Sequence, residues 1–276
     1  MKKIFLLLFT LLFTVTLSAQ RKEKIKGSKI ISVTQRDVDS FNEIEAEDNL
    51  EIFLVKGSAR GFEIEADDNL HDVITAEVNN NRLRIYTSKK ITRYKKLSIR
   101  ITYTDELKLI SAKNEVVINA ISDLTLNNIT VKNFDYSKSF LNVRANNFTL
   151  EMTDKTKAEL NFKGDSCRIQ LSKNADLKAL IATSDIKLDM YERATAVIEG
   201  DAANALLRTD NSANFMGNRF TVKNMELVAE GYSKCDVFVN ESVTIEASGK
   251  ADVTLHGSPK IEINRFENNV SLHKKE

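Results

Sequence analysis

One short pattern returns six times between residues 158 and 255 and constrains the fold more than any other feature of the sequence. Each copy is a small apolar residue, a polar residue and a second apolar residue. The copies are Ala158-Glu159-Leu160, Ala175-Asp176-Leu177, Ala194-Thr195-Ala196, Ala213-Asn214-Phe215, Cys235-Asp236-Val237 and Ala251-Asp252-Val253. A repeat of roughly 16 to 22 positions that contains two or more short strands is typical of a β-solenoid.

Strand geometry explains why such a chain should coil. Alternate side chains of a strand face opposite sides, so the two apolar residues of each copy point inward and the polar one outward. Because such short runs cannot bury a face alone, successive turns stack about 4.8 Å apart around a narrow core. Coils of such uneven length do not keep the strict hexapeptide beat of a left-handed helix. We therefore predict an all-β fold, with a right-handed single-stranded parallel β-helix of irregular coils over residues 111–276.

The part before the β-helix is less regular. Residues 29–110 contain short alternating runs separated by longer connections, which indicate a β-rich N-terminal region. The sequence leaves open whether this region is a separate domain or the first coils. One short helical turn is expected within residues 68–78. Residues 20–28 are basic and polar, and are expected to form a disordered arm.

The extreme N-terminus has the parts of a secretory signal peptide. Lys2 and Lys3 precede an apolar run over residues 4–17, which is short for a membrane span, and a small-residue cleavage point follows Ala19. Residues 1–19 therefore predict export to the periplasm, the outer-membrane surface or the extracellular space. The alternative is an uncleaved membrane anchor. After removal of the signal peptide no transmembrane span is expected.

Charge and reactive residues exclude several classes of function. Removal of residues 1–19 takes away two lysines and changes the formal charge from +1 to −1, so nothing favours a nucleic-acid partner. The two cysteines, Cys167 and Cys235, occupy inward positions several coils apart and are expected to be free and buried. The sequence has no metal-ligand spacing among its three histidines, no recognisable nucleophile motif and no glycine-rich phosphate loop. We expect no cofactor, no metal and no enzyme activity.

The order of strands and turns resembles a known family. The succession is carried by residues 41–44, 49–57, 62–70 and 81–86, with a closing coil at residues 249–259. It is similar to the head GIN domain of auto-transporter adhesins exported by Bacteroidetes-type bacteria, although Glu47-Asp48-Asn49 stands where the family has Gly-Ile-Asn. The resemblance implies a right-handed β-helix, an exported location and adhesin-like binding. The segment after Leu255 is expected to be too short for a translocator barrel.

A basic and aromatic cluster is the first candidate ligand-binding site. Its members are Lys89, Lys90, Arg93, Tyr94, Lys95 and Lys96. Such a cluster suits an anionic glycan or a lipopolysaccharide phosphate. The alternative is a charged hairpin whose role is to block edge-to-edge strand pairing.

Two outward faces of the β-helix are further candidates. If the register of the copies holds, their middle residues form a polar column, which is either a binding strip or a solvated face. Two positions later Val197, Met216 and Phe238 are all apolar and predict a contact patch. Its partner is either another segment of this chain or a second molecule.

Taken together, these features favour a non-catalytic binding or adhesin-like protein of the bacterial envelope. Its expected partners are a glycan or an envelope or extracellular protein. A structural or self-assembling envelope scaffold is the alternative. A polysaccharide lyase or hydrolase is less favoured, because coils this short leave no long loops to wall a catalytic groove.

Overall fold

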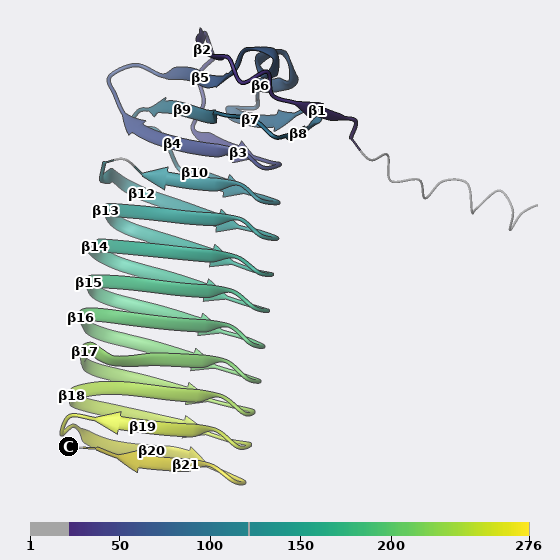
Figure 1. The fold of residues 1–276 in the computed structure, drawn as a ribbon. Coiled ribbons are helices and arrows are strands. Elements are labelled where there is room, and N and C mark those ends of the chain that lie inside the picture. The colour runs from purple at the N-terminus through teal and green to yellow at the C-terminus, as the bar shows by residue number, and fades with distance from the viewer. Residues whose placement is uncertain (1–21, 121, 276) are drawn as a thin grey trace, which may run out of the picture.

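The computed structural model describes residues 22–120 and 122–275, and is built almost entirely of strands (Figure 1). Strands account for 68% of the chain and helix for 2%, and the strands form a solenoid of about nine turns. The prediction of an all-β solenoid is therefore confirmed. The predicted signal peptide, residues 1–19, lies outside the described residues. No helix in the described part of the chain is long and apolar enough to span a membrane.

The described ranges contain twenty-one strands and one 3-10 helix. The N-terminal elements are β1 (Lys24–Lys26), β2 (Ile31–Arg36), β3 (Glu43–Ala46), β4 (Glu51–Lys56), β5 (Gly61–Asp67), η1 (Asp68–Val73), β6 (Ile74–Asn79), β7 (Arg82–Thr87), β8 (Lys90–Thr92) and β9 (Leu97–Tyr103). The remaining elements are β10 (Leu109–Ala112), β11 (Val117–Ala120), β12 (Leu124–Asn133), β13 (Lys138–Met152), β14 (Lys157–Leu171), β15 (Asp176–Met190), β16 (Thr195–Thr209), β17 (Asn214–Ala229), β18 (Lys234–Ala247), β19 (Asp252–His256), β20 (Lys260–Phe266) and β21 (Ser271–Lys274). The helical turn expected within 68–78 is confirmed as η1.

The coils are more regular than the sequence indicated. Parallel pairing places one residue of each coil in a single column, formed by Lys138, Lys157, Asp176, Thr195, Asn214, Lys234, Asp252 and Ser271. The step between members is constant except for one longer step, from Asn214 to Lys234, and one shorter step, from Lys234 to Asp252.

The wide variation in coil length that the sequence predicted is therefore wrong. Two of the six copies were assigned two positions out of register. Ala158 pairs with Leu177, and Cys235 pairs with Phe215. The side chains of a strand alternate between two faces, so a shift of two positions leaves the same side chains pointing inward. The apolar–polar pattern therefore does not reveal such a shift.

A column of small residues marks the point where each turn enters the next strand. Its members are Ser137, Thr156, Ala175, Ala194, Ala213, Ser233 and Ala251, all 0–1% exposed. The carbonyl of each accepts a backbone hydrogen bond from the next coil, such as Asp176 N to Thr156 O at 3.0 Å. Val116 and Val270 take this place beside the first and last of the turns, so the small side chains belong to the coils between them.

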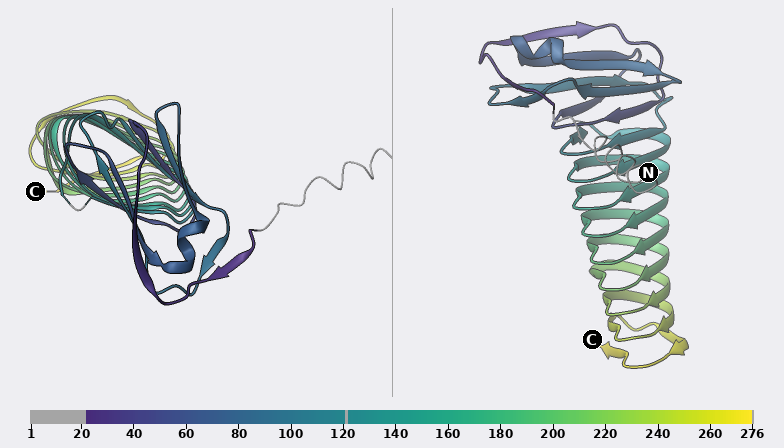
Figure 2. Two further views of the ribbon diagram at one scale, coloured as in Figure 1. Left: turned by 90° about the horizontal axis from the view of Figure 1, so that it is seen from above. Right: turned by 90° about the vertical axis from the view of Figure 1, so that its right-hand side faces the viewer.

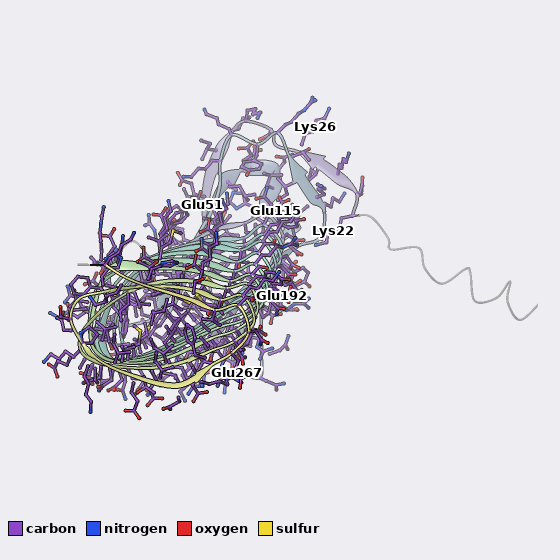
Figure 3. All side chains as sticks on the ribbon, turned by 90° about the horizontal axis from the view of Figure 1, so that it is seen from below. Lys22, Lys26, Glu51, Glu115, Glu192 and Glu267 are labelled. Carbon is purple, nitrogen blue, oxygen red and sulfur yellow. The ribbon has the colours of Figure 1, made fainter. Side chains whose placement is uncertain are left out.

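The turns themselves stack along one edge of the solenoid, which we call the turn edge. One residue in each turn has a positive φ, and these residues are Asn114, Asp135, Asp154, Lys173, Glu192, Asn211, Gly231, Gly249 and Asn268. From Asp135 onward, the residue after each donates its backbone amide to the positive-φ residue of the preceding coil, as Tyr136 N does to Asn114 O at 2.8 Å. Glu115 and Glu192 mark this edge in the view along the solenoid axis (Figure 3). The turn backbone is thus hydrogen-bonded from coil to coil.

The N-terminal region continues the solenoid and closes its first end. β3 pairs in parallel with β10, and β4 with β11, so β3 and β4 form a coil that stacks on the coil of β10 and β11. The strands β5 to β9 are inserted between these two coils in the sequence. β7 and β9 pair in parallel above β3 and β4, while β2, β5 and β6 add antiparallel pairings that no later coil has within the described residues. Figure 2 shows this broader layer at one end of the narrow coil stack. One continuous hydrophobic core runs from Phe41 to Leu255.

The basic segment before β2 is not disordered where the structure describes it. β1 pairs in parallel with β8, with Lys24 opposite Lys90. Two further backbone hydrogen bonds flank the pairing, from Lys90 N to Glu23 O and from Gly27 N to Thr92 O. The expectation of a disordered arm over residues 20–28 is therefore wrong for the β1 segment, which we call the N-terminal arm (residues 22–30).

Both cysteines have the environment that the sequence predicted. Cys167 and Cys235 are free and buried. Burial raises the pKa of both thiols, and that of Cys235 to about 12. Neither sulfur is placed to act as a nucleophile at neutral pH.

Candidate functional site

The polar column predicted along the β-helix is divided between two columns: Asp176, Thr195, Asn214 and Asp252 stack in one, and Glu159 and Asp236 fall in the next. Glu159 pairs with Lys178, while Asp176 pairs with Thr195, so the two acids belong to neighbouring columns. The same two-position shift that affected Ala158 separates them. Lysine and neutral polar residues separate the acids of the first column, and Lys178, Val197 and Met216 separate those of the second, so neither column is a continuous strip of carboxylates.

The predicted contact patch is also divided. Val197 and Met216 are neighbours on β16 and β17, but the next residue in that column is Asp236. Phe238 instead lies opposite His256, and their rings stack with centroids 6.4 Å apart. All three residues of the predicted patch are half-buried rather than exposed. The structure therefore provides no single apolar patch made of Val197, Met216 and Phe238.

The basic cluster is brought together and enlarged by the N-terminal arm. Lys89, Lys90 and Arg93 lie in or beside β8, and Tyr94, Lys95 and Lys96 follow it toward β9. β1 adds Lys24 and Lys26 alongside, from a segment far away in the sequence. We call the surface formed by Lys24, Lys26, Lys89, Lys90, Arg93, Lys95 and Lys96 the basic surface. Sequence reasoning missed the contribution of β1, since its local composition resembles that of a disordered arm.

Few carboxylates neutralise the basic surface. Lys89 pairs with Glu23 at 2.9 Å, and Lys96 with Glu65 at 3.2 Å. Within the described residues the other five cations of the surface form no ion pair with a carboxylate. The surface therefore has charge available for an anionic partner. β1 covers one edge of β8, and within the described residues the other edge has no strand partner, so a charged hairpin that guards an open edge stays the alternative explanation of this cluster.

Asp67 holds the arm and the basic segment in place. This residue is fully buried at the end of β5, and its carboxylate accepts backbone hydrogen bonds from Lys29, Lys95 and Lys96 at 2.8–3.1 Å. Burial alone would raise the pKa of this carboxyl. The three amide donors outweigh that effect, so the pKa of Asp67 lies below its usual value.

Asp48 anchors the other end of the arm. Its carboxylate accepts hydrogen bonds from Lys22 Nζ at 2.6 Å and from the backbone amide and hydroxyl of Thr87 at 2.8 and 2.9 Å. Burial raises the pKa of Asp48, but Lys22 and Thr87 together lower it below its ordinary value. Asp48 also has a positive φ of 72°. Its backbone thus resembles that of the turn residues of later coils.

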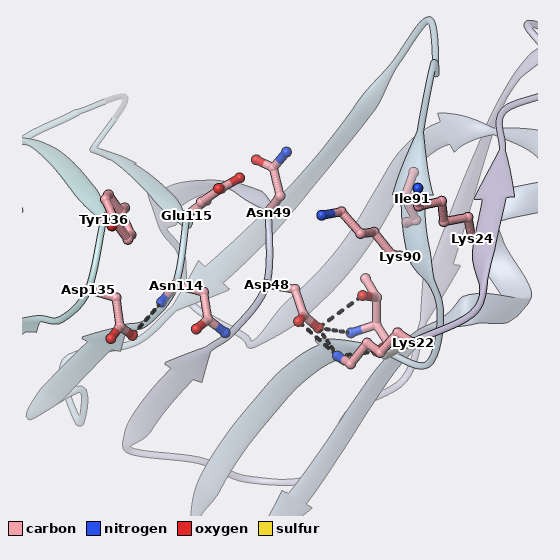
Figure 4. Close-up of a pocket in the computed structure, with 11 residues that line it drawn as sticks. Lys22, Lys24, Asp48, Asn49, Lys90, Ile91, Asn114, Glu115, Asp135 and Tyr136 are labelled. Atoms are coloured by element: carbon pink, nitrogen blue, oxygen red, sulfur yellow. Dashed lines mark hydrogen bonds and ion pairs between the residues drawn. The ribbon is translucent and has the colours of Figure 1, made fainter. Parts of the chain in front are cut away.

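Between the arm and the turn edge lies a cavity of about 620 Å³ (Figure 4). Lys24, Lys90 and Ile91 form the wall on the arm side. Asn49, Asn114, Glu115, Asp135 and Tyr136 form the wall on the solenoid side, and Lys22, Asp48 and Thr87 complete the lining. The volume is within the range of small-ligand sites. Lys24 and Lys90 belong both to this cavity and to the basic surface, so the two sites are continuous.

Three carboxylates line this cavity, but only one is available. Asp48 is occupied by Lys22 and Thr87, and Asp135 accepts the backbone amide of Asn114 at 2.9 Å. Glu115 is exposed and has no hydrogen bond or ion pair within the described residues. In the same part of the chain, no group of three or more His, Cys, Asp or Glu side chains is placed to hold a metal ion.

Comparisons with known proteins add independent findings. The model of one protein family, described as putative auto-transporter adhesin, head GIN domain, matches residues 40–259. A putative adhesin from Parabacteroides merdae has a similar structure, with 16% sequence identity and a TM-score of 0.68 over 92% of this chain and 100% of that chain. A putative lipid binding protein from Parabacteroides distasonis is 15% identical, with a TM-score of 0.64 over the same shares of the two chains. A search of the curated proteins finds no match.

Proposed function

The chain belongs to the putative auto-transporter adhesin, head GIN domain family, and from this membership we propose that it is an exported, non-catalytic binding protein of the bacterial envelope. Its fold is shared with putative adhesins. The signal peptide predicted over residues 1–19 supports export. The proposed partner is an anionic glycan, held by the basic surface at the N-terminal end of the solenoid.

The observation that carries this proposal is the collection of unpaired cations on β1 and β8. Two segments far apart in sequence both contribute lysines, and the arm is tied down at Asp48 and Asp67 so that these lysines stay together. A surface that only needed solubility would not require such anchoring. Lysine ammonium groups without protein partners are suited to carboxylates, sulfates or phosphates of a polymer.

A glycan and extracellular-matrix array tests the proposal. The mature chain, residues 20–276, is compared with a variant in which Lys89, Lys90, Arg93, Lys95 and Lys96 are changed to Ala. A matched control changes five exposed cations of the β-helix to Ala, namely Lys138, Lys163, Arg168, Lys178 and Lys223. We expect selective binding to anionic glycans that the first variant loses and the control keeps. Equal loss in both variants, or no selective binding by the mature chain, contradicts the proposal.

A specific observation favours a second candidate function, a self-assembling envelope scaffold. β20 pairs with β18 on one side only within the described residues, and it exposes Ile261, Ile263 and Phe266 by 40–48%. Apolar side chains on an open strand edge are suited to contact another chain. Sedimentation analysis tests this candidate: assembly that is abolished by Ile263→Lys supports it, and a monomer at all concentrations contradicts it.

A further inference from the structure

The cavity between the N-terminal arm and the turn edge has an unusual pair of like charges on one wall. Lys24 and Lys90 are direct partners in the parallel pairing of β1 and β8, so their side chains leave the same face of this two-stranded sheet. Both line the cavity and both are exposed. Like charges directly opposite each other destabilise a strand pair. An anion between the two ammonium groups would remove that repulsion.

The opposite wall offers hydrogen-bonding groups for a hydroxylated molecule. The carboxylate of Glu115 accepts hydrogen bonds only, and it has no partner within the described residues. The exposed amides of Asn49 and Asn114 lie beside it, and Lys90 extends from β8 toward Asn49 and Glu115 (Figure 4). A simple anion such as sulfate would face the Glu115 carboxylate without a proton to donate. A molecule that carries hydroxyl groups as well as a negative charge satisfies both walls.

Tyr136 provides an aromatic surface at the rim. It is 55% exposed, and it follows the positive-φ residue Asp135 at the turn edge. The ammonium group of Lys155 lies 5.5 Å from its ring centroid and so occupies one face of the ring. The ring also lines the cavity. Aromatic rings with a polar edge suit ligands that are apolar on one face and wet on the other, as a pyranose ring is.

We propose that this cavity binds one acidic sugar unit of a polysaccharide. Its carboxylate lies between the ammonium groups of Lys24 and Lys90. Its hydroxyls donate to Glu115 and hydrogen-bond to Asn49 and Asn114, and its ring packs against Tyr136. The inference rests on the proposed binding of an anionic glycan, and it adds a defined pocket and a chemical class to that function. The rest of the basic surface then follows the neighbouring units of the polymer.

A titration with oligogalacturonate tests the pocket, using neutral oligogalactose and inorganic sulfate as comparison probes. Because the chain has no tryptophan and six tyrosines, 3-fluorotyrosine labelling gives a small set of fluorine NMR signals, and Tyr136→Phe assigns the one in the pocket. We expect oligogalacturonate to shift the Tyr136 signal. Oligogalactose and sulfate should bind at least about tenfold more weakly, since each lacks one of the two recognised features.

Two pairs of variants separate the pocket from the basic surface. Lys90→Glu and Tyr136→Ala should each weaken binding about tenfold or more, while Tyr136→Phe keeps it. Lys26→Glu changes a cation of the basic surface that does not line the cavity, so it should weaken oligogalacturonate binding by less than Lys90→Glu does. Tyr232→Ala removes an equivalent turn-edge tyrosine, 63% exposed and 5.1 Å from the ammonium group of Lys250. We expect Tyr232→Ala to change binding by less than about twofold.

The outcomes distinguish this inference from the proposed function. If Lys26→Glu weakens binding as much as Lys90→Glu, the glycan is held by diffuse charge, so the pocket is refuted while the proposed function stands. If sulfate binds as tightly as oligogalacturonate, the site is a general anion site and not a sugar site. If no acidic glycan binds, the proposed function fails together with the pocket. Appearance of an unsaturated uronate product in the titration would overturn the non-catalytic role.

Discussion

The buried carboxylate of Asp67 accepts a 2.8 Å hydrogen bond from the backbone amide of Lys29, 38 positions earlier in the chain. The same carboxylate receives the amides of Lys95 and Lys96. One side chain at the end of β5 therefore fixes the N-terminal arm and the segment after β8 relative to each other. The geometry of the basic surface depends on this acidic group together with Asp48, which holds the other end of the arm.

The first prediction concerns the loss of that group. Asp67→Asn replaces a charged acceptor of three amides with a neutral group and turns a donor toward them, so we expect a loss of about 2–3 kcal/mol in the free energy of unfolding. Denaturant unfolding measures it, and amide hydrogen exchange should become faster in β1. Asp72→Asn is the control, because Asp72 is exposed and forms no hydrogen bond or ion pair in the described part of the chain. Equal stability of the two variants would contradict the role of Asp67.

The second prediction is an acid-induced release of the arm. The pKa values of Asp67 and Asp48 are lowered in the folded state, so their contribution to stability is present above the unfolded pKa of about 3.9. It is lost as the pH falls below that value toward the folded pKa values. Hydrogen exchange in β1 should therefore accelerate relative to β14 on acidification below about pH 4. A uniform acceleration across both strands would show that the carboxylates do not control the arm.

The third prediction concerns a glycine inside the solenoid. Gly200 has a φ of +110°, which residues with a side chain rarely adopt, and an added Cβ would lie 2.1 Å from the carbonyl oxygen of Ile181. Gly200→Ala should destabilise the protein by about 2–3 kcal/mol. Gly61→Ala is the control, since its nearest contact would be 3.2 Å from the Thr102 hydroxyl. Thermal unfolding of the two variants measures the difference, and a melting temperature for Gly200→Ala equal to that of the control refutes the backbone constraint.

The fourth prediction concerns the column of small buried residues. Within the described residues the hydroxyl of Ser137 has no hydrogen-bond partner, whereas the hydroxyl of Ser233 accepts one from Thr209 at 3.1 Å. Ala occupies the equivalent place in other coils. We expect Ser137→Ala to leave stability unchanged or raise it by up to about 1 kcal/mol, and Ser233→Ala to lower it by about 1 kcal/mol. Denaturant unfolding compares the two, and the opposite order would count against this assignment of the column.

The solenoid could be predicted from the sequence, but its register could not. The repeat comes from a pattern that most coils share, a small residue beside the turn followed by an alternating strand. Ala158 and Cys235 satisfied the same pattern two positions away, because strand alternation does not distinguish shifts of two. The correct register needs the positive-φ residues, which are Asn, Asp and Gly in most turns but Lys173 and Glu192 in two. No local signal marks those two.

The candidate site was predicted only in part, for a different physical reason. The basic residues after Thr87 were visible as a charge cluster, but the pairing of β1 with β8 was not. Both strands are rich in lysine, so their local preference is to stay apart. Their pairing depends on Asp48 and Asp67, whose partners lie 26 to 39 positions away in sequence. Contacts between residues this far apart in sequence cannot be recognised from local composition or from the spacing of apolar residues.

Because the turn edge is hydrogen-bonded from coil to coil, the length of the solenoid increases by the same amount with every coil. Each coil adds about 4.8 Å along the axis. The extra residue of the one longer step is accommodated within β17, where the register against β16 shifts, and not at the turn. The roughly nine coils thus hold the basic end about 40 Å from the opposite end. Gain or loss of a whole coil would change the distance between the basic end and the opposite end without altering the cavity beside β1.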